Sequence, residues 1–149
     1  MPESARLSIA QMRERGIKVF IATGRLLKYT GVVSDLEVDG YVTVNGGYCI
    51  TSEGEVIYEC AIPPQTMKKV FDLRRKYGFS LALLTESGMY VESLEGRAKE
   101  VADLINIYPE VADLEYIAST QRVLQICPYI DPELERVIMS ELEECVSSR

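Results

Sequence analysis

The chain has 149 residues, of which 47% are hydrophobic and 26% charged, a composition that is ordinary for a small folded protein and argues against disorder. Its formal net charge of −7 and the lack of a basic cluster exclude the usual nucleic-acid-binding proteins, which need a basic face. No apolar run approaches the roughly 20 residues of a membrane span and no signal-peptide core follows Met1, so we expect a cytoplasmic protein.

The first predicted elements are a short helix and a strand. Pro2-Glu3-Ser4 is typical of a helix start, apolar residues recur at helical spacing over residues 5–12, and Gly16 ends the helix. Residues 17–22 are rich in Val, Phe and Ile and contain one charge. This pattern predicts a strand that is buried on both faces, as in a parallel sheet.

Thr23, Gly24 and Arg25 follow this strand directly. In open α/β sheets, ligands bind beyond the carboxyl ends of the strands, where a Thr hydroxyl and the accessible backbone N–H of a glycine suit a phosphate. A helix that starts at Arg25 would add free N–H groups that favour an anion. The pattern indicates a phosphate site, although an ordinary strand with a glycine turn fits the same residues.

A second buried strand is predicted over residues 41–44, and Asn45, Gly46 and Gly47 follow it as a turn. Residues 48–51 and 55–60 then predict a hairpin around Ser52-Glu53-Gly54. Because Asn45 and Thr23 both stand at the carboxyl end of a strand, the two ends could converge on one crevice. A glycine pair in a hairpin loop is the alternative interpretation.

The pattern changes after Pro63-Pro64 to a helix, two strands, a helix, a strand and a helix. These elements are expected at residues 65–77, 79–84, 89–92, 97–107 and 122–127, with the last helix starting at Asp131-Pro132. They predict an α+β unit with one antiparallel sheet. Its loop residues Glu86, Ser87 and Tyr90 are candidates for substrate contact, but turn-forming and surface roles explain them equally well.

The number and spacing of cysteine and histidine residues limit the metal sites and catalytic groups that this chain can form. Cys49, Cys60, Cys127 and Cys145 form no C-x-x-C pair, which disfavours a zinc knuckle or a thioredoxin motif. Their hydrophobic neighbours predict buried, reduced thiols. The chain has no His, so a Ser-His-Asp triad, a Cys-His pair and histidine metal ligation are excluded.

Two segments, Arg-Gly-Ile-Lys-Val-Phe-Ile-Ala-Thr-Gly-Arg at residues 15–25 and Asp-Gly-Tyr-Val-Thr-Val-Asn-Gly-Gly at residues 39–47, carry a family resemblance. In this order and spacing they resemble the haloacid dehalogenase superfamily, specifically its Cof-type branch of cap-bearing sugar-phosphate and phosphate-ester hydrolases. The resemblance implies an α/β fold with a partial Rossmann-like core at residues 1–62, an α+β cap at 63–144 and a truncated return to the core at 145–149. It also implies a small phosphorylated metabolite as ligand. The phosphate would bind at Thr23, Gly24 and Arg25, with Asn45, Gly46 and Gly47 near the substrate.

Family motifs are also missing. The family begins with a strand that ends in Asp-x-Asp-Gly-Thr, whose first Asp is the nucleophile and second Asp the general acid/base, and this chain contains no Asp-x-Asp. A Gly-Asp-x-x-Asn-Asp loop, which helps to hold Mg²⁺ in the family, is absent as well. The resemblance thus implies Mg²⁺ for the complete enzyme, but we identify no catalytic residue and no metal ligand here.

Two functions follow from these observations. The first is a fragment of a Mg²⁺-dependent phosphate monoester hydrolase that works through an aspartyl phosphate and is inactive as written. The second is a non-catalytic binding module that retains the cap and self-associates as a homo-oligomer. In that case the strands at residues 17–22 and 41–44 would have unpaired edges and uncovered apolar faces, which recruit another chain.

Overall fold

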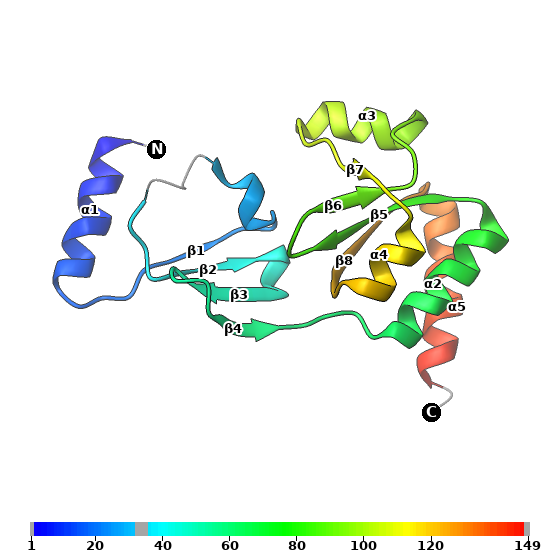
Figure 1. Cartoon of the computed structure of the whole chain (residues 1–149), viewed down its shortest axis with the longest axis horizontal. Helices are drawn as coiled ribbons and strands as arrows, with labels where there is room; N and C mark the ends of the chain where they lie inside the picture. Colours follow the sequence, from blue (N-terminus) through cyan, green and yellow to red (C-terminus); the bar gives the residue numbers. More distant parts are fainter. Residues whose placement is uncertain (1, 32–35, 148–149) are drawn as a thin grey trace. The chain divides into compact units, whose positions relative to one another are not determined.

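The computed structural model describes residues 2–31 and 36–147, with side chains described as far as residue 142. These residues form two compact units (Figure 1). The first unit contains residues 1–62 together with the short segments 84–88 and 122–125. The second unit contains the other described residues after Ile62.

The first unit is built around a mixed four-stranded sheet in the order β1-β2-β3-β4. Strand β1 pairs in parallel with β2, whereas β2, β3 and β4 pair in antiparallel fashion. The elements are α1 (Glu3–Glu14), β1 (Phe20–Ala22), the 3₁₀ turn η1 (Leu27–Tyr29), β2 (Gly40–Thr43), the 3₁₀ turn η3 (Val44–Gly46), β3 (Tyr48–Thr51) and β4 (Val56–Glu59).

Asp39 fixes the amino ends of β1 and β2. Its carboxylate accepts hydrogen bonds from the Val19 N–H at 2.9 Å and from the Lys18 ammonium at 2.9 Å. Its own N–H donates to the Val19 carbonyl at 2.8 Å. The Val19 N–H and then the Lys18 ammonium hold the pKa of Asp39 below its ordinary value, since both interactions favour the carboxylate. The acidic residue of the Asp39-Gly40 motif therefore has a structural role.

Gly40 fixes the register of the same strands. A Cβ atom at this position would collide with the Ile50 carbonyl oxygen on β3 and with the Phe20 ring on β1. Only glycine allows three neighbouring strands to approach this closely.

Several predictions for this unit are wrong. The strand predicted at residues 17–22 is shorter and exposed, since Ile17 is 50% exposed and Phe20 45% exposed. Burial fails because β1 is an edge strand and α1, which buries no side chain, does not cover it. No α-helix begins at Arg25, where the chain instead leads into the three-residue turn η1. The strand predicted at residues 41–44 has no unpaired edge, because β2 lies between β1 and β3.

The second unit contains helices around a second four-stranded sheet, in the order β7-β6-β5-β8. Its elements are α2 (Pro64–Tyr77), β5 (Ser80–Thr85), β6 (Met89–Val91), α3 (Gly96–Ile105), β7 (Glu110–Val111), α4 (Leu114–Thr120), β8 (Val123–Tyr129) and α5 (Pro132–Ser147). By their contacts, the carboxyl end of β5 and the amino end of β8 belong to the first unit. Helix α5 continues through Ser147, and the rest of the predicted return to the core, residues 148–149, lies outside the described residues.

The sequence did not predict β7 and α4, and the sheet is not wholly antiparallel because β6 and β7 pair in parallel. Both missed elements are short. Helix α4 has seven residues and begins where the Asp113 carboxylate accepts hydrogen bonds from the N–H groups of Glu115 and Tyr116, at 2.9 and 3.0 Å. The Asp113 N-cap is the feature of the sequence that could have predicted the start of α4.

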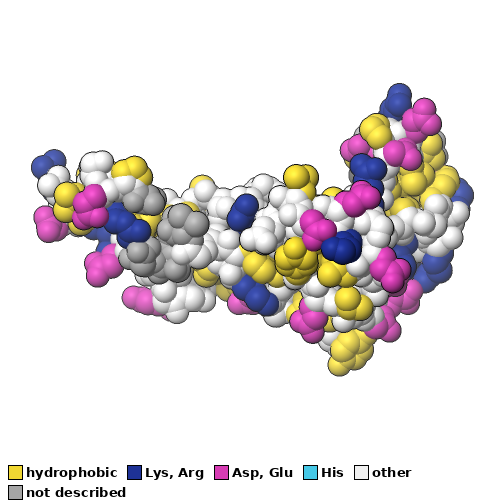
Figure 2. All heavy atoms as spheres, turned by 90° about the horizontal axis from the view of Figure 1, so that it is seen from above, with side chains coloured by type: hydrophobic (Ala, Val, Ile, Leu, Met, Phe, Trp, Pro, Cys, Tyr) yellow, Lys and Arg dark blue, Asp and Glu magenta, His cyan; other side chains and the backbone are white. Residues whose placement is uncertain are grey.

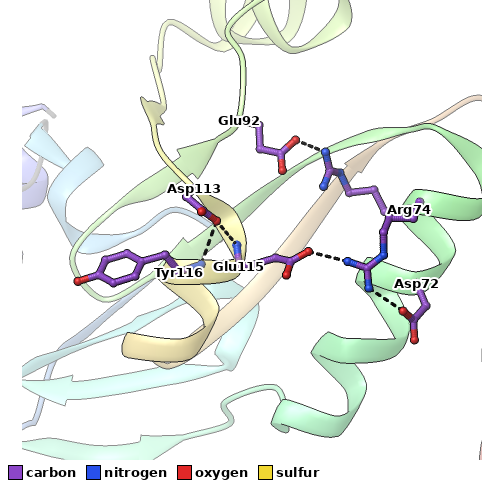
Figure 3. A network of polar contacts seen from close by, with 7 residues as sticks. Asp72, Arg74, Glu92, Asp113, Glu115 and Tyr116 are labelled. Carbon is purple, nitrogen blue, oxygen red and sulfur yellow. Dashed lines mark hydrogen bonds and ion pairs between the residues drawn. The ribbon is translucent and has the colours of Figure 1, made fainter.

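Polar contacts join α2 to the elements packed beside it (Figure 3). Arg74 pairs with Glu92, which follows β6. The next residue, Arg75, pairs with Glu115 of α4 at 2.6 Å and with Asp72 of its own helix at 2.7 Å. Exposed pairs of this kind contribute only up to about 1 kcal/mol each, so they orient the helices more than they stabilise them.

Helices α2 and α5 run side by side (Figure 1) and are joined through one carboxylate. Glu141 of α5 accepts hydrogen bonds from the Lys76 ammonium, at 2.8 Å, and from the Tyr77 hydroxyl. Because both donors favour the charged form, the pKa of Glu141 lies below its ordinary value.

Charged side chains of both signs are scattered over the face in Figure 2, between exposed hydrophobic ones. Across residues 2–31 and 36–147, no helix combines the length and the apolar character that a membrane span needs.

We expect Leu83→Ala to lower the free energy of unfolding by about 2–5 kcal/mol, because the Leu83 side chain in β5 is completely buried and its loss leaves a cavity. Leu104→Ala on α3 is the matched control. Its side chain is 83% exposed, so the change should stay within about 0.5 kcal/mol. Urea denaturation followed by circular dichroism measures both, and equal effects would contradict the described core.

Candidate phosphate site

The parallel pairing of β1 with β2 continues past the ends of both strands. The Thr23 N–H donates to the Val42 carbonyl at 2.8 Å, and the Val44 N–H donates to the Arg25 carbonyl at 3.4 Å. The chain segments after the two strands therefore stay side by side. In this way the structure brings Thr23, Gly24 and Arg25 next to Val44 and Asn45.

Thr23 shapes the first of these segments. Its hydroxyl oxygen accepts a hydrogen bond from the Arg25 N–H at 3.1 Å, which closes a tight turn over Gly24. Thr23 is half-buried, whereas Gly24 and Arg25 are exposed. The turn therefore presents a backbone segment with no β-carbon, flanked by a hydroxyl and a cationic side chain.

Asn45 lies directly against Gly24. A Cβ atom built on Gly24 would be 2.6 Å from Asn45 Oδ1, so the absence of a side chain at Gly24 makes room for this amide. The Asn45 Nδ2 group donates to Gln125 Oε1 at 3.4 Å. Gln125 belongs to the short segment 122–125 of the same compact unit and was not predicted, since nothing in the local sequence relates it to Asn45.

The loop after β2 has an unusual backbone. Val44 and Asn45 have φ angles of +52° and +53°, and Gly46 has φ of +92°. Asn and Gly tolerate this left-handed region, but a buried β-branched residue such as Val44 adopts it rarely and at a cost. The Gly47 N–H closes the loop on the Val44 carbonyl at 2.9 Å. The predicted turn at Asn45, Gly46 and Gly47 is confirmed, and its strain at Val44 was not foreseen.

The turn between β5 and β6 lies in the same unit as these residues. The Lys28 ammonium donates to the Ser87 carbonyl at 3.3 Å. Burial, and then the neighbouring Glu86 carboxylate, raise the pKa of the Tyr48 hydroxyl to about 12. Ser87 thus contacts the exposed Lys28 through its carbonyl, and Glu86 lies near the Tyr48 hydroxyl. The third loop candidate, Tyr90, is buried in β6 at 7% exposure and is a core residue.

The described residues do not fit a magnesium site. They contain no group of three or more Asp, Glu or Cys side chains that could hold a metal ion. Mg²⁺ prefers carboxylate oxygens, and the site residues at the ends of β1 and β2 supply a hydroxyl and an amide instead. Asp39, the acidic residue of the second motif, is at the opposite ends of these strands.

The sequence profile of the haloacid dehalogenase-like hydrolases matches residues 1–148. The chain belongs to this family. A Bacillus subtilis (strain 168) protein called "Putative phosphatase YkrA" is 26% identical in an alignment of length 145, which covers 91% of this chain and 53% of that protein.

Solved structures of haloacid dehalogenase phosphatases have the same fold. BT1666 from Bacteroides thetaiotaomicron has a TM-score of 0.84 and 30% identity over 95% of this chain and 53% of its own. BT4131, described as a subclass IIB sugar phosphatase, has a TM-score of 0.72 and 29% identity over 94% of this chain and 55% of its own. The predicted family, its Cof-type branch and the α/β fold are confirmed, and the chain spans about half the length of these relatives.

We expect Gly24→Ala to displace the Asn45 side chain with little loss of stability, because the new methyl group meets the end of a movable side chain and not the backbone. Gly31→Ala is the control, since a Cβ there has no heavy atom within 4 Å. The Asn45 side-chain amide resonances in a ¹H–¹⁵N spectrum report the displacement. Unchanged resonances in Gly24→Ala would contradict the close contact.

Proposed function

We propose that the first unit binds the phosphoryl group of a small phosphorylated metabolite at Thr23, Gly24 and Arg25, beside Asn45, Gly46 and Gly47. The contact between Gly24 and Asn45 is the observation that carries this proposal, because it unites the ends of two parallel strands in one small polar corner. Open α/β sheets bind ligands at such ends.

The chemistry of the corner suits a phosphoryl group. A hydroxyl can donate to a phosphoryl oxygen, a glycine lets the oxygen approach the backbone closely, and the exposed Arg25 supplies positive charge nearby. A sugar phosphate is the substrate class we favour, because BT4131 is described as a sugar phosphatase.

We further propose that the chain as written does not hydrolyse phosphate esters above background. In the family, an aspartate attacks the phosphorus and water then hydrolyses the aspartyl phosphate, with Mg²⁺ assisting. This sequence has no Asp-x-Asp, and the site residues supply a hydroxyl and an amide but no nucleophilic carboxylate. Residues that only position a substrate cannot supply covalent catalysis. The expected Mg²⁺ requirement belongs to the complete enzyme, and the cytoplasmic location stays a prediction.

We expect Thr23→Ala to weaken the binding of inorganic phosphate by about tenfold, because it removes one hydrogen bond to a charged group. Thr120→Ala, whose hydroxyl donates to the Tyr116 carbonyl in α4, is the control and should bind as the unaltered chain does. Titration of the ¹⁵N-labelled chain with phosphate measures the affinity. Equal affinity in the two variants would contradict the assignment of Thr23.

The same proteins are tested for hydrolysis of p-nitrophenyl phosphate with Mg²⁺ and with a chelator. We expect no turnover above background in any of them. Turnover that requires both Mg²⁺ and Thr23 would mean that another residue of this chain acts as nucleophile.

A second proposal is that the chain self-associates as a homo-oligomer. The edge strand β4 exposes three consecutive apolar side chains, Val56, Ile57 and Tyr58, each at least 50% exposed, and the edge strand β1 exposes Phe20. Exposed apolar edges favour pairing with another chain. Sedimentation velocity should detect a dimer that Ile57→Lys abolishes, with Leu104→Lys as the exposed control. A monomer at all concentrations would exclude the dimer.

A further inference from the structure

The β3–β4 hairpin carries two cysteines on one face. Cys49 stands directly opposite Tyr58 in the antiparallel register. The ladder continues toward the end of the hairpin, where the Cys60 N–H donates to the Gly47 carbonyl at 2.8 Å. Side chains two residues apart on a strand share a face, so Cys60 lies on the same face as Tyr58 and Cys49. Cys49 and Cys60 are therefore diagonal neighbours across the two strands.

Tyr58 connects the two thiols. The interaction of its hydroxyl with the Cys60 thiol, followed by burial and then by the Cys49 thiol, raises the pKa of Tyr58 above its ordinary value. The phenol responds to both sulfur atoms, which agrees with the placement given by the register.

Both thiols are accessible. Cys60 is exposed and Cys49 is half-buried, and both are free cysteines. The prediction of buried thiols is wrong for Cys60, because this residue follows the last residue of an edge strand whose side chains point mostly to solvent, and Cys49 and Cys127 are only half-buried. An exposed thiol next to a second thiol is the arrangement that oxidants convert to a disulfide.

Each cysteine also holds the loop of the candidate phosphate site. The Cys49 thiol donates to the Gly46 carbonyl at 3.9 Å, and the Cys60 N–H holds the next carbonyl, that of Gly47. A bond between the sulfur atoms would remove the first contact and move the backbone that makes the second. Oxidation at this pair therefore acts on the loop that carries Asn45.

The Cα–Cα distance expected between Cys49 and Cys60 is at the upper limit for a disulfide bond. Diagonal neighbours in an antiparallel pair have Cα atoms about 7–8 Å apart, and disulfides span about 4.4–6.8 Å. Closure needs a shift on the order of 1 Å. Cys60 can supply this shift because it lies just beyond β4, which ends at Glu59.

We propose that Cys49 and Cys60 form an oxidisable thiol pair, a modification site at which a peroxide produces an intramolecular disulfide. The exposed Cys60 thiolate attacks the peroxide, the O–O bond breaks, and Cys60 becomes a sulfenic acid as one water molecule is formed. The Cys49 thiolate then attacks the Cys60 sulfur, the S–O bond breaks and a second water molecule leaves. Two thiols lose two electrons, and one peroxide gains them.

The test treats the reduced, folded chain with one equivalent of hydrogen peroxide, followed by alkylation of the remaining thiols and digestion. Trypsin leaves both cysteines in one peptide, because residues 29–67 contain no Lys or Arg. Cleavage after glutamate separates them, because Glu53, Glu55 and Glu59 lie between them. We expect a linked pair of peptides containing Cys49 and Cys60, lighter than the reduced pair by two hydrogen atoms.

Serine variants of three cysteines test the role of each thiol in forming the disulfide. Cys60→Ser should abolish the link, Cys49→Ser should leave Cys60 as a sulfenic acid that dimedone traps, and Cys127→Ser should form the link normally. In the oxidised chain the Gly46 and Gly47 amide resonances should shift. A folded chain in which Cys60 is oxidised or alkylated without any Cys49–Cys60 link would overturn the proposal, as would a link that needs Cys127.

Discussion

The parallel pairing of β1 with β2 is the constraint on which the first unit depends. It is fixed at one end by Asp39, whose carboxylate holds the Val19 N–H, and at the other by the bonds from Thr23 to Val42 and from Val44 to Arg25. A shift of one residue in this register would reverse the faces of the side chains and separate Thr23 from Asn45. The candidate phosphate corner is therefore a consequence of strand register more than of any single polar contact.

Sequence patterns predicted the parts of this corner that depend on strand direction. Thr23 and Asn45 lie at the same edge because the carboxyl ends of parallel strands share one edge of a sheet, which periodicity and glycine positions already indicate. Contacts made by distant residues had no such signal, and Gln125 reaches Asn45 across 80 positions of the chain. The burial of residues 17–22 was predicted wrongly because an apolar composition describes what a strand can bury and not what covers it. The short β7 and α4 gave too few periodic positions to recognise.

The residues around Gly24 have the arrangement of a ligand site, with a hydroxyl, an amide and a backbone segment free of side chains, yet the chain carries no Asp-x-Asp. Carboxylates that are held by donors, such as Asp39 and Glu141, connect secondary structure elements instead. Asp39 and Glu141 thus serve the assembly of their units, while the candidate site offers neutral and cationic groups.

The left-handed backbone at Val44 and Asn45 makes the conformation of this loop depend on the pairing of the neighbouring strands. Holding the β-branched Val44 in this region costs about 1–3 kcal/mol, and the residue keeps this conformation only while its surroundings enforce it. When β2 or β3 loosens, the loop can relax well before the unit unfolds as a whole. The proposed affinity for phosphate would then fall ahead of global melting. Mild heat, a destabilising substitution and a chemical change in the hairpin would each weaken the proposed binding through the same release of backbone strain.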